Sequence, residues 1–508
     1  MEYNRRIRLG CMLCICLMLC GCAVKPGLPA AGATLPPAES KWSAPENDVN
    51  LSYSRLVMLY LPSLDGTRLI AVPASVHLSA ARHYAETLSN LLLSYPGTET
   101  TASLGDGVLL SLSETNPIEI SGKVATVNLS ASALRLSHEQ LFTVGQALAN
   151  TLCQFGDLEY VNVLIAGAQP GLDIAATLPA GCFQFNTRED LSTLWARASA
   201  PKTAARRAIT AALYYPAAAG KGILCEARTL SFDEISTAAM AETLLKAISA
   251  GAQNLPNMPA CPDLMGYSVK APEQVAAGGL RKLVLHFDND LNAALLEAGI
   301  TRSVMMAAIT CTMTTFLPGL DGVEIHIGTE HLRSLSPSGT YTGAGETITF
   351  SDGLMRRKQF TSFLLTPCTL YFANQSGKLV SVSRPVPFYS AHHPRALIEQ
   401  LMLGPQNIDS VSGLNAVLPQ GLRDADLLGV SFQEDTMILN FSSRLTDLCQ
   451  GMDREKESCM VYGMVNTLAE LPGVKKVCFY IVGRQPESFA GSLFLPGDFM
   501  PNLNIIQQ

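Results

Sequence analysis

The feature that most restricts the fold of this chain is an internal repeat. Each repeat opens on a Leu-Tyr pair: "LYLPS" at 59–63, "LYYPA" at 213–217 and "LYFAN" at 370–374. Each closes on a stretch that begins with Thr and ends in an alternating apolar run before Gly, and these stretches align without a gap: 151–167, 312–328 and 467–483. Because self-similarity in a fixed order marks one structural unit used repeatedly, the sequence predicts three tandem domains.

The pattern inside each repeat predicts a small α+β domain. A second strand follows the opening strand, and an amphipathic helix follows the second strand, with the stretch "AETL" identical at 85–88 and 241–244. A weak strand, a stronger strand, a helix and a final strand complete each copy. We expect the order ββαββαβ, folded as a mixed sheet with two helices on one face.

The repeat also fixes the predicted domain boundaries, and a chain of 508 residues is long enough for about three domains. The boundaries are a signal peptide at 1–21, a Pro/Ala/Gly-rich spacer at 22–52, domain 1 at 53–170, a linker at 171–205, a divergent domain 2 at 206–329, a linker at 330–362, and domain 3 with a C-terminal tail at 363–508.

The N-terminus predicts export and a lipid anchor. Three arginines precede the apolar run "LGCMLCICLML", which is typical of a signal peptide and short for a membrane span. The run leads into residues 19–22, which resemble the cleavage box of bacterial lipoproteins, in which Cys22 is the lipid acceptor and the first mature residue. The alternative is an uncleaved N-terminal anchor. Both interpretations place the protein on the outer face of the cytoplasmic membrane.

Charge and cysteine content exclude some classes. The net charge of −7 argues against a nucleic-acid-binding protein, which needs a basic surface. Nine cysteines follow Cys22 without regular spacing, so they predict buried thiols rather than a disulfide framework, with a bridge between Cys449 and Cys459 left open.

The third repeat resembles the GerM-type (GerMN) sporulation and spore germination domain. The matching stretches are "TLYFANQSGKLVSVSRPV", "ALIEQLMLGP", "LPQG" at 418–421, "MILNFS" and "MVNTLAELPGVKKVCFYIVG". The first repeat keeps the ends and "VNLS", and the middle repeat has diverged further. The resemblance implies a lipoprotein of endospore-forming bacteria with tandem domains, whose fold is similar to the ring-building modules of envelope assemblies.

No catalytic, cofactor-binding or metal-binding residue is expected. The eight histidines lack metal-binding spacing, and the strand residues His286 and His326 are expected to be ordinary sheet-face residues. Recurrent polar residues are expected to serve the core, the helix ends or a solvated helix face: Asn128, His286 and Asn440; Thr151, Thr312 and Thr467; Glu86, Glu242 and Glu399.

The leading functional hypothesis is a non-enzymatic, membrane-anchored envelope lipoprotein that contacts other proteins of a sporulation or germination complex. The alternative is an extracytoplasmic lipoprotein that binds a peptidoglycan fragment or a germinant, which the low aromatic content of 7% disfavours. A cell-wall hydrolase needs a carboxylate pair or a metal, and no motif in the sequence supplies either.

Overall fold

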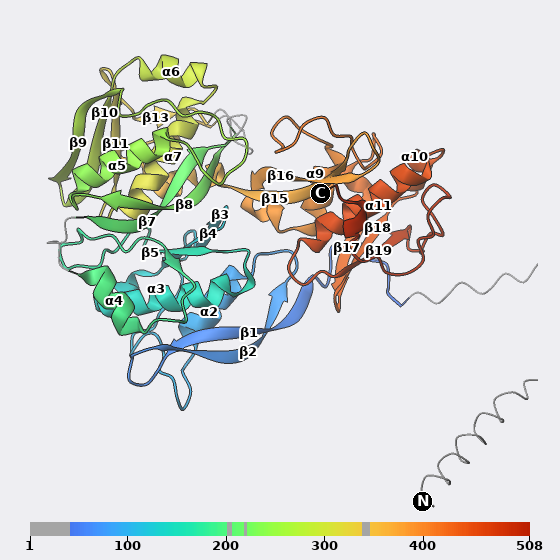
Figure 1. Cartoon of the computed structure of the whole chain (residues 1–508), viewed down its shortest axis with the longest axis horizontal. Helices are drawn as coiled ribbons and strands as arrows, with labels where there is room; N and C mark the ends of the chain where they lie inside the picture. The colour runs from blue at the N-terminus through green and yellow to red at the C-terminus, as the bar shows by residue number, and fades with distance from the viewer. Residues whose placement is uncertain (1–40, 201–205, 218–220, 338–345, 508) are drawn as a thin grey trace, which may run out of the picture. The chain divides into compact units, whose positions relative to one another are not determined.

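The structure is a computed structural model that describes residues 41–200, 206–217, 221–337 and 346–507 (Figure 1). The chain divides into two compact units, Met1–Lys41 and Trp42–Gln508, and all described helices and strands lie in the second. Cys22 lies outside the described residues. Within the second unit we distinguish a first segment (52–199), a second segment (207–363) and a third segment (365–507).

The first segment contains two long strands, two main helices and several short strands. Its elements are β1 (Ser52–Pro62), β2 (Leu69–Ser79), α2 (Ala85–Ser94), β3 (Ile118–Ser121), β4 (Val124–Leu129), α3 (His138–Leu152), β5 (Tyr160–Ile165), β6 (Phe183–Gln184) and α4 (Leu191–Ser199). The predicted linker at 171–205 thus contains β6, which pairs with β5, and the helix α4.

The second segment follows a similar order and ends in a short 3-10 helix. Its elements are β7 (Arg207–Pro216), β8 (Ile223–Phe232), α5 (Thr237–Ser249), β9 (Ser268–Ala277), β10 (Leu280–Phe287), α6 (Leu291–Glu297), α7 (Arg302–Phe316), β11 (Gly322–Ile327), β12 (Glu330–His331), β13 (Ser334–Leu335), β14 (Ile348–Thr349) and the 3-10 helix Arg357–Phe363. The predicted linker at 330–362 therefore holds three short strands and most of this 3-10 helix.

The third segment adds two short helices to the same order. Its elements are β15 (Leu365–Ala373), β16 (Leu379–Pro387), α8 (Phe388–Ala391), α9 (Pro394–Met402), β17 (Leu427–Gln433), β18 (Thr436–Phe441), α10 (Arg444–Cys449), α11 (Arg454–Ala469) and β19 (Lys476–Ile481). The mixed α+β class expected from the sequence is confirmed.

The strands of each segment form two main sheets, where the sequence predicted one, and the second segment adds the short two-stranded sheet β13–β14. The two opening strands make an antiparallel ribbon: β1–β2, β7–β8 or β15–β16. The later strands form a mixed sheet in which the central strand pairs antiparallel with its predecessor and parallel with the strand after the second helix. Two-stranded ribbons twist more strongly than larger sheets, which separates the long ribbon from the shorter strands.

One helix in each segment packs against the opening strand of its own segment: α3 against β1, α7 against β7 and α11 against β15. These helices supply much of three separate hydrophobic cores. Side chains at the start of two of them accept hydrogen bonds from free backbone N–H groups, as helix caps do: Ser137 from Gln140 and Asp453 from Lys456. The most buried is α7, in which every residue from Ser303 to Phe316 is buried.

Residues 42–49, which we call the N-terminal strap, pack against the third segment although they precede the first. The Tyr480 hydroxyl donates to the Trp42 carbonyl at 2.6 Å, and the Asn440 side chain donates to the Pro45 carbonyl at 2.9 Å. The Arg395 guanidinium forms two hydrogen bonds of 2.7 Å to the Asp48 carboxylate. The third segment therefore includes a piece of chain from far outside its own sequence range.

The nine described cysteines are all free, including the pair that the sequence left open. The Cys449 thiol lies 3.6 Å from the Met460 sulfur, whereas the Cys459 thiol lies 3.3 Å from the Gly377 carbonyl oxygen. Burial raises the pKa of Cys449 to about 11, so its thiol stays protonated at neutral pH.

Glu457 in the first turn of α11 holds the C-terminal loop through a buried carboxylate. The carboxylate accepts five hydrogen bonds, from the Ser488 hydroxyl at 2.6 Å and from the backbone N–H groups of Phe489, Ala490, Ser492 and Leu493 at 2.9 Å each. Burial raises the pKa of Glu457, but these donors lower it more, so the pKa lies below its ordinary value.

We expect Glu457→Gln to lower the free energy of unfolding at pH 7 by roughly 2–3 kcal/mol, since hydrogen bonds to a charged group are the strong ones. The carboxylate's contribution is present above the pKa of the unfolded chain, about 4.3, and is lost as the pH falls through the lower folded value. Urea unfolding at pH 7 and at pH 3 measures this difference, which should shrink at the lower pH. The exposed neighbour Glu455 supplies the control Glu455→Gln, and equal effects of both variants would contradict the prediction.

Candidate functional site: a polar pocket around Arg357

The recurrent threonines occupy one equivalent contact in each segment. The Thr151 hydroxyl accepts a hydrogen bond from the backbone N–H of Tyr60 at 3.1 Å. The same bond joins Thr312 to Tyr214 at 2.9 Å, and Thr467 to Tyr371 at 3.2 Å. The sequence placed these threonines in the core or at helix ends, and in the structure each hydroxyl fastens its helix to the opening strand of the segment. All three threonines are fully buried.

The recurrent asparagines hold a turn after the final strand. The Asn128 side-chain oxygen accepts from the backbone N–H of Gly167 at 2.9 Å, and Asn440 accepts from Gly483 at 3.1 Å. The second segment has His286 at the corresponding position, and its ring instead stacks on a histidine of the neighbouring strand. The first and third segments thus share a side-chain bond to the turn that the second segment lacks.

The recurrent glutamates of the first two segments lie on helix surfaces, and the two strand histidines lie next to each other in one sheet. Glu86 is exposed and Glu242 is half-buried 4.0 Å from Lys246, as a solvated helix position would be. His286 and His326 are direct register partners on adjacent parallel strands, so the two residues that the sequence predicted to be sheet-face residues lie side by side.

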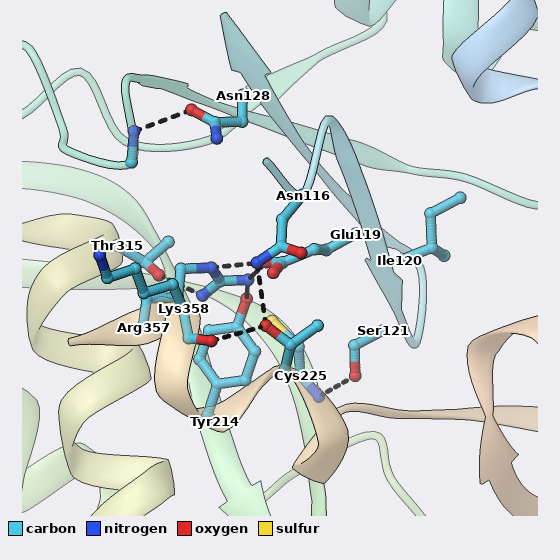
Figure 2. Close-up of polar contacts among 12 residues, drawn as sticks. Asn116, Glu119, Ile120, Ser121, Asn128, Tyr214, Cys225, Thr315, Arg357 and Lys358 are labelled. Atoms are coloured by element: carbon cyan, nitrogen blue, oxygen red, sulfur yellow. Dashed lines mark hydrogen bonds and ion pairs between the residues drawn. The ribbon is translucent and has the colours of Figure 1, made fainter. Parts of the chain in front are cut away.

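A cavity lined by many polar groups lies between the first and second segments, at the start of the 3-10 helix Arg357–Phe363. Its volume is about 400 Å³. The polar groups that line it include Thr115, Asn116, Asn128, Asp321, Arg356 and Lys358. Figure 2 shows Asn116 and Lys358 beside Arg357, and Asn128 farther away. We treat this pocket as the candidate functional site.

Arg357 connects two segments through one buried guanidinium (Figure 2). It donates to the Glu119 carboxylate at 2.6 Å and to the Thr315 hydroxyl at 2.6 Å. A third bond of 2.8 Å reaches the hydroxyl of Tyr214. Burial lowers the pKa of Arg357, but the adjacent carboxylate raises it more, so the pKa lies well above its ordinary value. The guanidinium is thus charged and fully engaged with protein groups.

Two further basic residues lie beside Arg357. The Arg356 guanidinium pairs with Asp352 and holds the pKa of that carboxyl at about 2. Lys358 is exposed, and within the described ranges no protein group bonds its ammonium. The pocket is lined by hydroxyls, amides, a free ammonium and the carboxylates of Glu119 and Asp321, so it suits a small polar ligand better than an apolar one.

Sequence reasoning missed Arg357, Glu119 and the pocket. The available signal was the basic triplet at 356–358 inside a predicted linker, where charges are ordinarily solvated. Nothing local in the sequence shows that one of these three charges is buried against a strand more than 200 residues earlier.

Among the described residues, no single helix has both the length and the hydropathy of a membrane span. The helices α6 and α7 meet that test only together, and the chain bends by 107° between them.

Comparison with known proteins gives matches at both ends of the second unit. The Germane family model, described as sporulation and spore germination, matches residues 58–170 and 369–487. The comparison with curated proteins found no match.

Two solved structures from Bacillus subtilis are similar to parts of the chain. The tandem GerMN domains of the sporulation protein GerM are 17% identical, with a TM-score of 0.22, over 59% of this chain and 99% of theirs. The first GerMN domain of the same protein is 20% identical, with a TM-score of 0.22, over 27% of this chain and 97% of its own. Two stretches of the chain, residues 58–170 and 369–487, therefore match the Germane model of sporulation and spore germination.

Proposed function

We propose that this protein is a non-enzymatic, membrane-anchored envelope lipoprotein that acts through protein–protein contact in sporulation or spore germination. The two Germane matches support the process, and the cleavage box that ends at Cys22 supports the anchor. The observation that carries the proposal is that the recurrent polar side chains form hydrogen bonds within the fold. In each segment the hydroxyl of the recurrent threonine accepts a hydrogen bond from the backbone of the opening strand: Thr151, Thr312 and Thr467. These recurrent residues therefore stabilise the fold, as expected of a scaffold protein.

The proposal includes a third copy of the domain in the second segment. This segment shares the order of strands and helices with its neighbours, and its central strand has the same two pairings, antiparallel and then parallel. Its Thr312–Tyr214 bond repeats the fastening of the other two segments. Loss of the asparagine that holds the turn, replaced by His286, accounts for part of its divergence from the family pattern.

Substitution of Cys22, with Cys20 as the control, tests the lipid anchor directly. Replacing Cys22 with serine is expected to abolish labelling by a radioactive fatty acid and to shift the protein out of the membrane fraction, because serine offers no thiol for the lipid. The matched control is Cys20→Ser in the same box, which should still be labelled and membrane-bound. Labelling that survives Cys22→Ser would contradict the anchor.

The proposed role is tested by affinity capture of the full-length protein from cells sampled through sporulation, with the Cys22→Ser variant as control. We expect envelope or sporulation proteins to be recovered with the lipidated protein during sporulation. Expression confined to vegetative growth, or capture that yields no envelope protein at any stage, would contradict the proposal.

The pocket favours a second candidate function, an extracytoplasmic lipoprotein that binds a peptidoglycan fragment or a germinant. Purified muropeptides titrated into the full-length protein by calorimetry would test it. Saturable binding that Lys358→Ala weakens supports this function, with the exposed Lys246→Ala on α5 as control. Absence of heat at millimolar muropeptide excludes it for that ligand.

A further inference from the structure

A row of histidines crosses the mixed sheet of the second segment. His286 on β10 is the register partner of His326 on β11, and His326 is the partner of His331 on β12. Ring centroids in both neighbouring pairs are 4.6 Å apart. Register partners point to one face of a sheet, so three imidazoles lie side by side on it.

Glu324 joins this row because it precedes His326 by two residues on β11 and therefore shares its face. The alternate residues of the strand, Ile325 and Ile327, are buried in the core. The side chains of Glu324 and His326 are 13% and 22% exposed. The row thus lies on the solvent side of the sheet, where an ion in water can reach it.

The ligand atoms lie close enough for one ion to bind them. One nitrogen or oxygen each from Glu324, His326 and His331 falls within 4.8 Å of the other two. Zinc ligands at about 2.1 Å from the ion lie roughly 3.4 Å apart in a tetrahedron, so small side-chain rotations suffice. The pair Glu324–His326 is already in contact, with 2.8 Å between the carboxylate oxygen and Nε2.

Neighbouring groups orient these side chains as outer-sphere partners of a metal site do. Lys282 on β10 forms an ion pair with Glu324. The His331 Nε2 lies 3.3 Å from the Gly353 carbonyl oxygen. Gly353 permits this approach, since a Cβ at that position would lie 2.6 Å from the His331 ring.

We propose that Glu324, His326 and His331 bind one divalent transition-metal ion, with zinc the preferred ion. Two imidazoles and one carboxylate suit zinc, nickel, cobalt or copper better than calcium or magnesium, which favour all-oxygen sites. Three protein ligands leave a position open to water. The ion joins β12 to β11, in the one segment where histidine has replaced the asparagine of the other two.

Calorimetric titration of zinc chloride into the full-length protein, freed of metal by a chelator, tests the site. We expect one saturable equivalent, and at least a tenfold weaker affinity in His331→Ala and in Glu324→Gln. The exposed strand residue His77 supplies the control His77→Ala, which should bind as the wild type does. Zinc should also raise the melting temperature of the wild type and of His77→Ala but not that of His331→Ala.

Cobalt binding separates histidine ligands from cysteine ligands by its visible absorption spectrum. The half-buried thiols Cys182 and Cys261 are the most accessible described cysteines. The proposal is overturned by the absence of saturable zinc binding in the wild type, by unchanged affinity in His331→Ala, or by binding that is lost in Cys182→Ser/Cys261→Ser. Circular dichroism of each variant verifies that the fold is retained.

Discussion

Arg384→Met is expected to lower the free energy of unfolding of the third segment by about 3–5 kcal/mol, because it leaves a buried carboxylate without its partner. The side chains of Arg384 on β16 and of Asp409 are 1% and 0% exposed. They form two parallel hydrogen bonds of 2.7 Å. The guanidinium also donates to the carbonyl oxygens of Gln400 at 2.9 Å and Gly404 at 2.7 Å.

A double replacement distinguishes two contributions to the loss of stability: the buried charge that is left unpaired and the packing contacts that are removed. Arg384→Met/Asp409→Leu removes both charges, so it should recover a large part of the stability lost in the single variant. Urea unfolding followed by the fluorescence of Trp42, which is buried against the third segment, measures both variants, with Trp195→Phe as the common background. A double variant no more stable than the single one would contradict this account.

Arg357→Met is expected to destabilise the first and second segments together, also by about 3–5 kcal/mol, since Glu119 would remain buried and unpaired. The guanidinium contacts β3 through Glu119 and contacts the second segment through Thr315 and Tyr214. Its loss should therefore increase hydrogen exchange in β3 and in α7 within one variant.

The adjacent Arg356 supplies a matched control for this prediction. Its ion pair with Asp352 is partly exposed, so Arg356→Met should change stability by no more than about 1 kcal/mol and leave exchange in β3 unchanged. Equal effects of the two variants, or increased exchange in the second segment alone, would contradict the role assigned to Arg357.

Much of the fold could be predicted because the same pattern of helix-like and strand-like segments occurs three times in the sequence. The apolar period marks the helices α3, α7 and α11, and the alternating runs mark β5, β11 and β19. The division of each segment into more than one sheet could not be predicted, because strand pairing depends on twist and on contacts between distant residues. The threonine bonds were missed for a related reason, since a hydroxyl within a helical run has its nearest acceptor and donor groups in that run.

The sites were harder to predict than the fold. Arg357 and Glu119 are separated by more than 200 residues, and a carboxylate in a short strand carries no sign of its partner. The histidine row depends on register, since His326 and His331 meet across a tight hairpin and His286 meets them only through a parallel pairing. Motif spacings written for helices do not describe such a set.

The N-terminal strap has a mechanical consequence. Chain order places residues 42–49 before β1, yet their contacts lie on the third segment, at Asn440, Tyr480 and Arg395. Tension applied to the chain on the N-terminal side of Trp42 is therefore carried first by the third segment, and the first segment is loaded only after the strap has peeled away. In a pulling experiment, the first rupture should lengthen the molecule by little more than the strap itself.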